Sequence, residues 1–253
     1  MTRLTNSPII ILFASFVVFW VAAWMGNRLR ARKENVSERT HADLTFVLSG
    51  ALTLLALIVG FSFSMAVTRY DQRKNCEAEE ANAIGTEYSR ADLLPAADTT
   101  KVRALIRRYL TARILAYEDQ SEPDLRRITA ETASLQTDMW SSVARSALEK
   151  PSPVSALVVA GMNDVLNSQA YTQAAWRNRI PFAAWLLLIV ISVFCNVLIG
   201  YGAYGRSPLL FLILPIVLSI SLFLIADIDC PYRGIIRVYP LNLESLAASL
   251  KPQ

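Results

Sequence analysis

Side chains that could carry out catalytic or metal chemistry are few in this sequence, and they are scattered. Among its 253 residues there is one histidine, His41, and the three cysteines form neither a C-x-x-C pair nor a spacing typical of a zinc site. The sequence also has no Walker lysine motif, no G-x-S-x-G and no H-E-x-x-H. We therefore predict that the protein is not an enzyme and has no cofactor or metal site.

The acidic residues do not suggest a catalytic pair either. Glu77, Glu79 and Glu80 stand close together, and we interpret them as a solvated helix face. Asp227 and Asp229 are two positions apart, which on a helix points their side chains in different directions. General acid–base catalysis by two neighbouring carboxyl groups is thus not indicated.

Most of the apolar residues lie in four uncharged stretches: residues 8–25, 44–67, 180–204 and 208–226. Each has about the 20 residues that a helix needs to cross the hydrocarbon core of a bilayer. The first stretch is longer than a signal-peptide core and lacks a cleavage site, so we predict that it is a retained membrane helix. The sequence therefore indicates an integral, multi-pass membrane protein.

The net charge of +4 is not spread evenly along the chain. Residues 68–179 contain 15 basic and 15 acidic residues, so the excess lies in the short segments beside the spans. This position favours contact with lipid headgroups over binding of nucleic acid.

The orientation in the membrane is a separate question. The arginines of the first connector favour a cytoplasmic place for that connector, but five basic residues around residues 69–74 and 177–179 favour the opposite orientation. Charge alone leaves the orientation open.

The long middle segment shows helical periodicity without strand-like alternation. Span two continues without proline to residue 94. Two further helices are predicted to begin near Thr99 or Thr100 and near Pro123, and a fourth occupies residues 154–179. Each of these two helices has one predicted apolar stripe: Val102, Leu105, Ile106, Tyr109 and Ile114 in the first, and Leu125, Ile128, Leu135, Met139 and Val143 in the second. The fold class is therefore all-α, with a helical soluble bundle between spans two and three. We divide the chain into spans one and two (1–67), the soluble bundle (68–179), spans three and four (180–227) and a carboxyl-terminal tail (228–253).

Span two is the candidate lining of a conduit. Thr53, Leu57 and Phe61 follow one another at four-residue intervals and so share one helix face. Spans two and three contain no carboxylate or basic side chain, which argues against a proton-coupled transporter. A passive pore, by contrast, can be gated by a hydrophobic constriction. The alternative is that these side chains pack against other spans or lipid.

Several sequence blocks point to a known family. Gly60-Phe61, followed by Val67-Thr68-Arg69-Tyr70, resembles the second membrane helix of bestrophin anion channels. The chain also resembles a bacterial family of bestrophin-like membrane proteins. The blocks that match that family include Glu80 to Thr86, Arg90 to Pro95, Asn163-Asp164 and Asp227 to Gly234. Within them, the following motif residues have no assigned role: Glu80, Asn82, Asp92, Asn163, Asp164, Asp227, Asp229 and Arg233.

The resemblance implies a homo-oligomeric ion channel, pentameric in bestrophins, in which span two of each subunit surrounds a central pore. The hydrophobic neck of that pore would map onto Thr53, Leu57 and Phe61, and small inorganic ions, anions in particular, would be the permeant species. It further implies a bacterial inner-membrane location with the soluble bundle in the cytoplasm. The competing hypothesis is a non-conducting sensor or scaffold whose helical bundle binds a partner.

Overall fold

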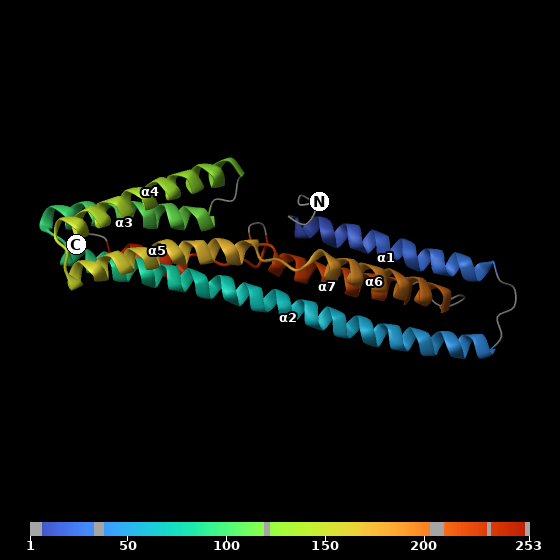
Figure 1. Ribbon diagram of the computed structural model, residues 1–253. Coiled ribbons are helices and arrows are strands. Elements are labelled where there is room, and N and C mark those ends of the chain that lie inside the picture. The colour runs from blue at the N-terminus through green and yellow to red at the C-terminus, as the bar shows by residue number, and fades with distance from the viewer. Residues whose placement is uncertain (1–6, 33–37, 119–121, 203–209, 232–233, 251–253) are drawn as a thin grey trace. The chain divides into compact units, whose positions relative to one another are not determined.

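The computed structural model describes residues 7–32, 38–118, 122–202, 210–231 and 234–250. Arg233 and the side chain of His41 lie outside this description. Within these ranges every regular element is a helix (Figure 1), as the all-α prediction requires. The helices are α1 (Pro8–Ala31), α2 (Glu38–Arg90), the 3₁₀ helix η1 (Ala91–Leu93), α3 (Ala96–Glu118), α4 (Glu122–Glu149), α5 (Pro153–Arg177), α6 (Phe182–Gly202), α7 (Leu210–Asp229) and α8 (Leu241–Ser249).

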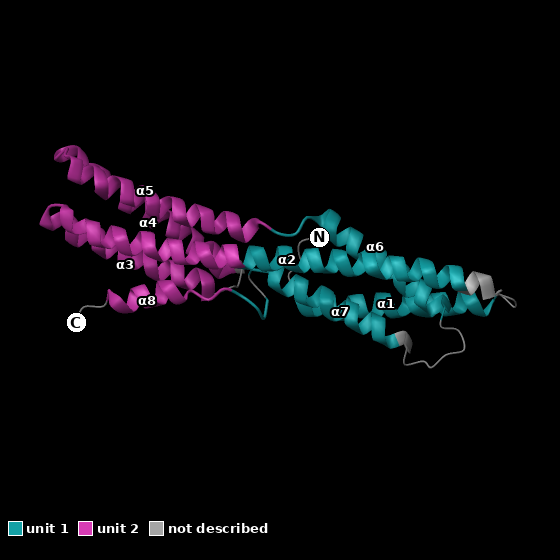
Figure 2. Cartoon of the chain, turned by 90° about the horizontal axis from the view of Figure 1, so that it is seen from below, with its two compact units in different colours: residues 1–70, 179–237 teal, residues 71–178, 238–253 magenta. Residues whose placement is uncertain are grey.

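The chain forms two compact units, coloured separately in Figure 2. Unit 1 comprises residues 1–70 and 179–237, and unit 2 comprises residues 71–178 and 238–253. Helix α2 contributes to both units because it continues for 53 residues without a break. Its sequence contains no proline that would interrupt the backbone hydrogen bonds of the helix.

Unit 1 contains the apolar helices. Four stretches of the described chain are long and apolar enough to cross a membrane: Pro8–Ala31, Ala42–Leu93, Pro153–Gly202 and Leu212–Asp229. The third stretch includes α5 and α6, but residues 178–181 between them are not helical. Pro181, the last of these four residues, cannot donate a backbone hydrogen bond. The apolar helices confirm that the protein belongs in a membrane.

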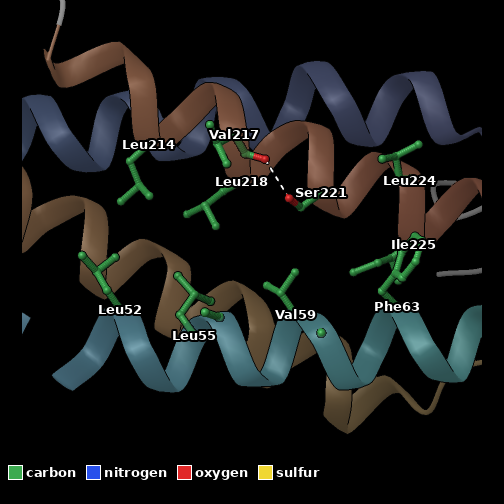
Figure 3. Close-up of a pocket in the computed structure, with 12 residues that line it drawn as sticks. Leu52, Leu55, Val59, Phe63, Leu214, Val217, Leu218, Ser221, Leu224 and Ile225 are labelled. Carbon is green, nitrogen blue, oxygen red and sulfur yellow. Dashed lines mark hydrogen bonds between the residues drawn. The ribbon is translucent and has the colours of Figure 1, made fainter. Parts of the chain in front are cut away.

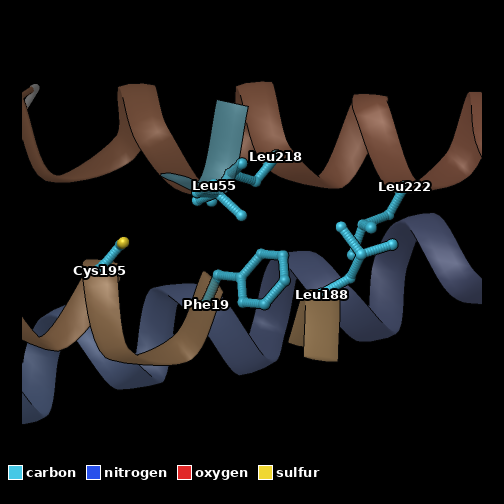
Figure 4. Close-up of a cluster of buried hydrophobic side chains, with 6 residues drawn as sticks. All are labelled: Phe19, Leu55, Leu188, Cys195, Leu218 and Leu222. Atoms are coloured by element: carbon cyan, nitrogen blue, oxygen red, sulfur yellow. The ribbon is translucent and has the colours of Figure 1, made fainter. Parts of the chain in front are cut away.

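A cluster of buried side chains holds the helices of unit 1 together (Figure 4). It brings together residues from α1, α2, α6 and α7: Phe19, Leu55, Leu188, Cys195, Leu218 and Leu222. Helices α1 and α6 also approach closely at Gly26 and Gly200, where an added Cβ would overlap the carbonyl oxygens of Val197 and Ala23. Small residues at such crossings let membrane helices make backbone contact.

Unit 2 is a helical bundle whose core follows the predicted apolar faces. In it α3 packs against α4 and α8, and α4 packs against α5. Most residues of the predicted stripes of α3 and α4 are buried: Val102, Leu105, Ile106, Tyr109, Ile128, Leu135, Met139 and Val143. The other two, Ile114 and Leu125, are half-buried. A capping box between Ser152 and Ser155 starts α5, with Pro153 in its first turn.

Two details of unit 2 differ from the sequence-based expectation. Helix α3 begins at Ala96 and not near Thr99, whose hydroxyl donates instead to the carbonyl oxygens of Ala91 and Leu94 at 2.9 and 3.0 Å. The short helix α8 was not predicted. Its nine residues are too few to form a stable helix in isolation, and its stability depends on tertiary contacts.

Candidate functional site

Helix α2 exposes one face in unit 1. Only 6% of the residues in its membrane-spanning window are buried by the rest of the chain, against 50% in α7. Leu57 is 54% exposed and Phe61 is 67% exposed, and Thr53 is exposed as well. Leu55 and Ala66, on the opposite side of the same helix, are buried. The three candidate residues therefore share the face of α2 that no other part of the described chain covers.

The exposed face is uncharged throughout this part of α2. The hydroxyl of Thr53 donates to the carbonyl oxygen of Ser49 at 2.9 Å, and that of Thr68 donates to the carbonyl oxygen of Ser64 at the same distance. Because both hydroxyl hydrogens are already bonded within the helix, the side chains present methyl groups and acceptor oxygens. Leu57 and Phe61, by contrast, present only carbon, which suits a hydrophobic constriction.

A different side of α2 borders an apolar groove of about 520 Å³ (Figure 3). The groove lies between α2 and α7, and the neighbouring aromatic residue Phe63 lines it, whereas Phe61 does not. Its one hydroxyl side chain, Ser221, donates to the carbonyl oxygen of Val217 at 2.9 Å. With no free polar group to replace the water of an ion, this groove fits apolar groups and cannot serve as an ion site.

In unit 2, α2 again presents an exposed row. Asp71, Asn75, Glu79 and Asn82 are all exposed and lie three or four positions apart, so they share one side of the helix. Counting along the helix, they continue the register of Phe61, Ser64 and Thr68. The charged residues in this row are acidic.

Glu80 lies in the core of unit 2, not on a solvated face. Its carboxylate accepts hydrogen bonds from the Arg113 guanidinium on α3 and from the Thr172 hydroxyl on α5, the latter at 3.0 Å. Glu80 and Arg113 are both almost completely buried. Burial by itself would lower the pKa of Arg113, but the adjacent Glu80 carboxylate raises it, so Arg113 stays charged.

Glu77 is also buried, because it caps α8. Its carboxylate accepts hydrogen bonds from the backbone N–H groups of Asn242 and Leu243 at 2.9 and 3.0 Å, and from the Asn242 side chain at 2.6 Å. A negative charge at a helix N-terminus is favourable. The prediction of a solvated acidic face is therefore wrong for Glu77 and Glu80, and of the three glutamates only Glu79 is exposed.

Asp227 and Asp229 connect the end of α7 to two other segments. Asp227 accepts hydrogen bonds from the backbone N–H groups of Ile235 and Ile236 at 2.7 and 2.8 Å. Asp229 accepts from the backbone N–H of Ile180 at 3.1 Å, and its carboxylate lies 3.6 Å from the Arg69 guanidinium. The two side chains thus have different partners, as their spacing on a helix predicts, and both stabilise the fold of unit 1.

The other motif residues are not brought together. Asp92 pairs with Arg103 at 2.6 Å at the surface, whereas Asn82, Asn163 and Asp164 are exposed. In the described part of the chain, no group of three or more His, Cys, Asp or Glu side chains could hold a metal ion.

Comparison with known proteins identifies the family of this chain. The family model of the Bestrophin-like domain matches residues 13–243. The chain belongs to the Bestrophin-like family. This match confirms the resemblance noted in the sequence. Bestrophin family members are ion channels and not enzymes.

Solved structures agree with the Bestrophin-like fold. Two crystal structures of variants of a bacterial bestrophin homolog from Klebsiella pneumoniae have TM-scores of 0.64 and 0.65 at 14% identity, each with 96% of this chain and 97% of that chain covered. A third variant of that homolog has a TM-score of 0.67 at 13% identity, with 96% of each chain covered. No curated protein matches the sequence. At these identities the structural likeness concerns the fold alone.

Proposed function

We propose that this Bestrophin-like protein is a homo-oligomeric channel for small ions, with α2 of each subunit lining a central pore. The observation that supports this proposal is the uncovered apolar face of α2 carrying Thr53, Leu57 and Phe61. An exposed apolar face this long needs a partner of low polarity. Lipid could cover it in a monomer, but α2 helices of several copies, arranged around an axis, would cover its flanks and leave its centre facing a pore.

The finer features of the proposal follow from the family. Five subunits and anions as the permeant class are expected from the bestrophin resemblance. The location would be a bacterial inner membrane, crossed four times by α1, α2, α6 and α7. Because the constriction residues are uncharged, they would control passage by pore width and wetting and would not discriminate the sign of the ion.

Planar-bilayer recording of the purified protein tests the proposal. We expect a conductance that increases in Leu57→Ala and Phe61→Ala, because removing these side chains widens the constriction and eases its wetting. Phe63→Ala is the matched control: it removes the same ring two positions away, where the side chain lines the groove, and should leave the conductance unchanged.

The oligomeric state has to be measured on the same preparations. A mass in detergent corresponding to several subunits is expected, because one helix per subunit cannot enclose a pore in a monomer or dimer. Intact oligomers that give no current at any voltage would overturn the channel proposal and favour the sensor or scaffold hypothesis.

A further inference from the structure

Glu87 is a buried acid whose surroundings differ from those of Glu77 and Glu80. It lies on the inner face of α2 in unit 2 and is 0% exposed. Neither of its carboxyl oxygens has a hydrogen-bond partner, whereas Glu77 and Glu80 both accept several bonds. An ionised carboxylate in this position would lose its hydration with no hydrogen bond to replace it, which is unfavourable.

The carboxyl group of Glu87 packs against the backbone of α5 at Gly161. A Cβ at Gly161 would overlap both Oε2 of Glu87 and Nη1 of Arg90, so the missing side chain provides the space that the two groups occupy. Arg90, on α2 itself, and Asp164, on α5, are the charged groups that act on Glu87. The nearby Asp92 is already paired with Arg103 of α3.

These surroundings favour the neutral acid. Burial raises the pKa of Glu87 most, Arg90 lowers it and Asp164 raises it, and together they raise it from 4.5 to about 8. Glu87 lies in unit 2, 20 positions beyond the uncharged stretch of α2 that ends at residue 67. Its proton can therefore exchange with the aqueous phase whenever the contact opens. At neutral pH the group is therefore a carboxylic acid while α2 and α5 remain packed.

We propose that Glu87 and Gly161 form a proton-sensitive contact, in which Glu87 is protonated while α2 and α5 are packed and releases its proton when they separate. The inference concerns unit 2 alone and does not depend on ion conduction.

The direction of the pH effect follows from linkage between proton binding and opening. In the open form Glu87 is hydrated and ionises near its ordinary pKa of 4.5. Between that value and about 8 the packed form binds more protons than the open form, so rising pH favours opening by about tenfold for each pH unit. Above a pH of about 8 both forms are ionised, and the dependence ends.

Hydrogen exchange on the full-length protein in detergent tests this contact. Protection factors, which are corrected for the intrinsic pH dependence of amide exchange, should fall about tenfold per pH unit between about pH 5.5 and 8 for amides around Gly161. They should then level off. Amides in the middle of α4 serve as an internal reference and should keep nearly constant protection.

Two variants make the experiment decisive. Glu87→Gln keeps the shape of the side chain and cannot ionise, so the slope around Gly161 should disappear. Glu79→Gln, an exposed change on the same helix, should retain the slope of the unmodified protein.

As a direct measurement of the proton, infrared difference spectra between low and high pH should show a carboxylic-acid band that is lost in Glu87→Gln. A slope that is absent from the unmodified protein, or that persists in Glu87→Gln, would overturn the inference.

Discussion

At the scale of single residues, Glu80 and Arg113 form a buried ion pair in unit 2. The two side chains come from α2 and α3, and Thr172 of α5 completes the set, so one charge pair connects three helices. Arg113 also lies over the Trp176 ring, 5.9 Å from its centroid. A buried pair of this kind contributes little net stability compared with apolar side chains, but breaking it is costly because one charge is left alone.

Glu80→Gln is therefore expected to reduce the free energy of unfolding by about 3–5 kcal/mol, because it leaves the Arg113 guanidinium buried without a counter-charge. The double variant Glu80→Leu with Arg113→Met should recover most of that loss, since it removes both charges together. Chemical denaturation of the full-length protein measures both effects. Asp92→Asn breaks an exposed pair and is the control, expected to cost at most about 1 kcal/mol. A loss in Glu80→Gln no larger than in that control would contradict this assignment.

At the scale of elements, α2 presents two different sides. Its inner side carries the buried acids of unit 2, and its other side is left uncovered, with the candidate constriction in the apolar part. The short helix α8 depends on the inner side, because Glu77 caps its N-terminus and Gly85 leaves room for the side chain of Leu246. The Glu77 carboxylate and the contact between Gly85 and Leu246 thus connect α8 to α2.

Removing that cap should release α8. Glu77→Ala leaves the backbone N–H groups of Asn242 and Leu243 without their acceptor, which costs about 1–2 kcal/mol at a helix N-terminus. Hydrogen exchange of residues 242–249 should then become about tenfold faster, while the core of α4 is unchanged. Glu79→Gln removes an acid two positions away without touching α8 and should not change this exchange. Equal acceleration in both variants would argue against the capping contact.

At the scale of the whole molecule, the exposed side of α2 could line a pore only in an oligomer. If several copies surround an axis, Asp71 and Glu79 of each copy form rings of negative charge beside the proposed pore. Such rings concentrate cations and repel anions. They would therefore oppose the passage of the anions that the family resemblance leads us to expect.

The double variant Asp71→Asn with Glu79→Gln should accordingly raise the permeability of anions relative to cations. The reversal potential under a salt gradient measures this permeability ratio. The difference in reversal potential between the double variant and the unmodified protein should shrink at high ionic strength, because charges are screened within about 3 Å at 1 M salt. Asp138→Asn, an exposed change on α4, is the matched control. An unchanged reversal potential in the double variant would show that this row does not face the ion pathway.

Much of the fold could be predicted because helices and membrane spans depend on local sequence. A run of about 20 uncharged apolar residues indicates a span wherever it occurs, and apolar residues at helical spacing predicted the buried stripes of α3 and α4. The family could likewise be identified from short blocks of residues. Helix α8 could not be predicted, because a nine-residue helix is stabilised by its contacts and not by its own sequence.

By itself the sequence determined the helical class, the apolar stretches and the face shared by Thr53, Leu57 and Phe61, since each of these depends on periodicity along one helix. Only the tertiary structure decided which acids are buried. Glu77, Glu79 and Glu80 look alike in sequence, but only Glu79 is exposed to solvent. The hydrogen-bond partners of the other two lie 33 to 166 residues away along the chain. Whether a carboxylate is solvated, paired with arginine or kept as a neutral acid depends on what packs against it, and that packing is set by the fold.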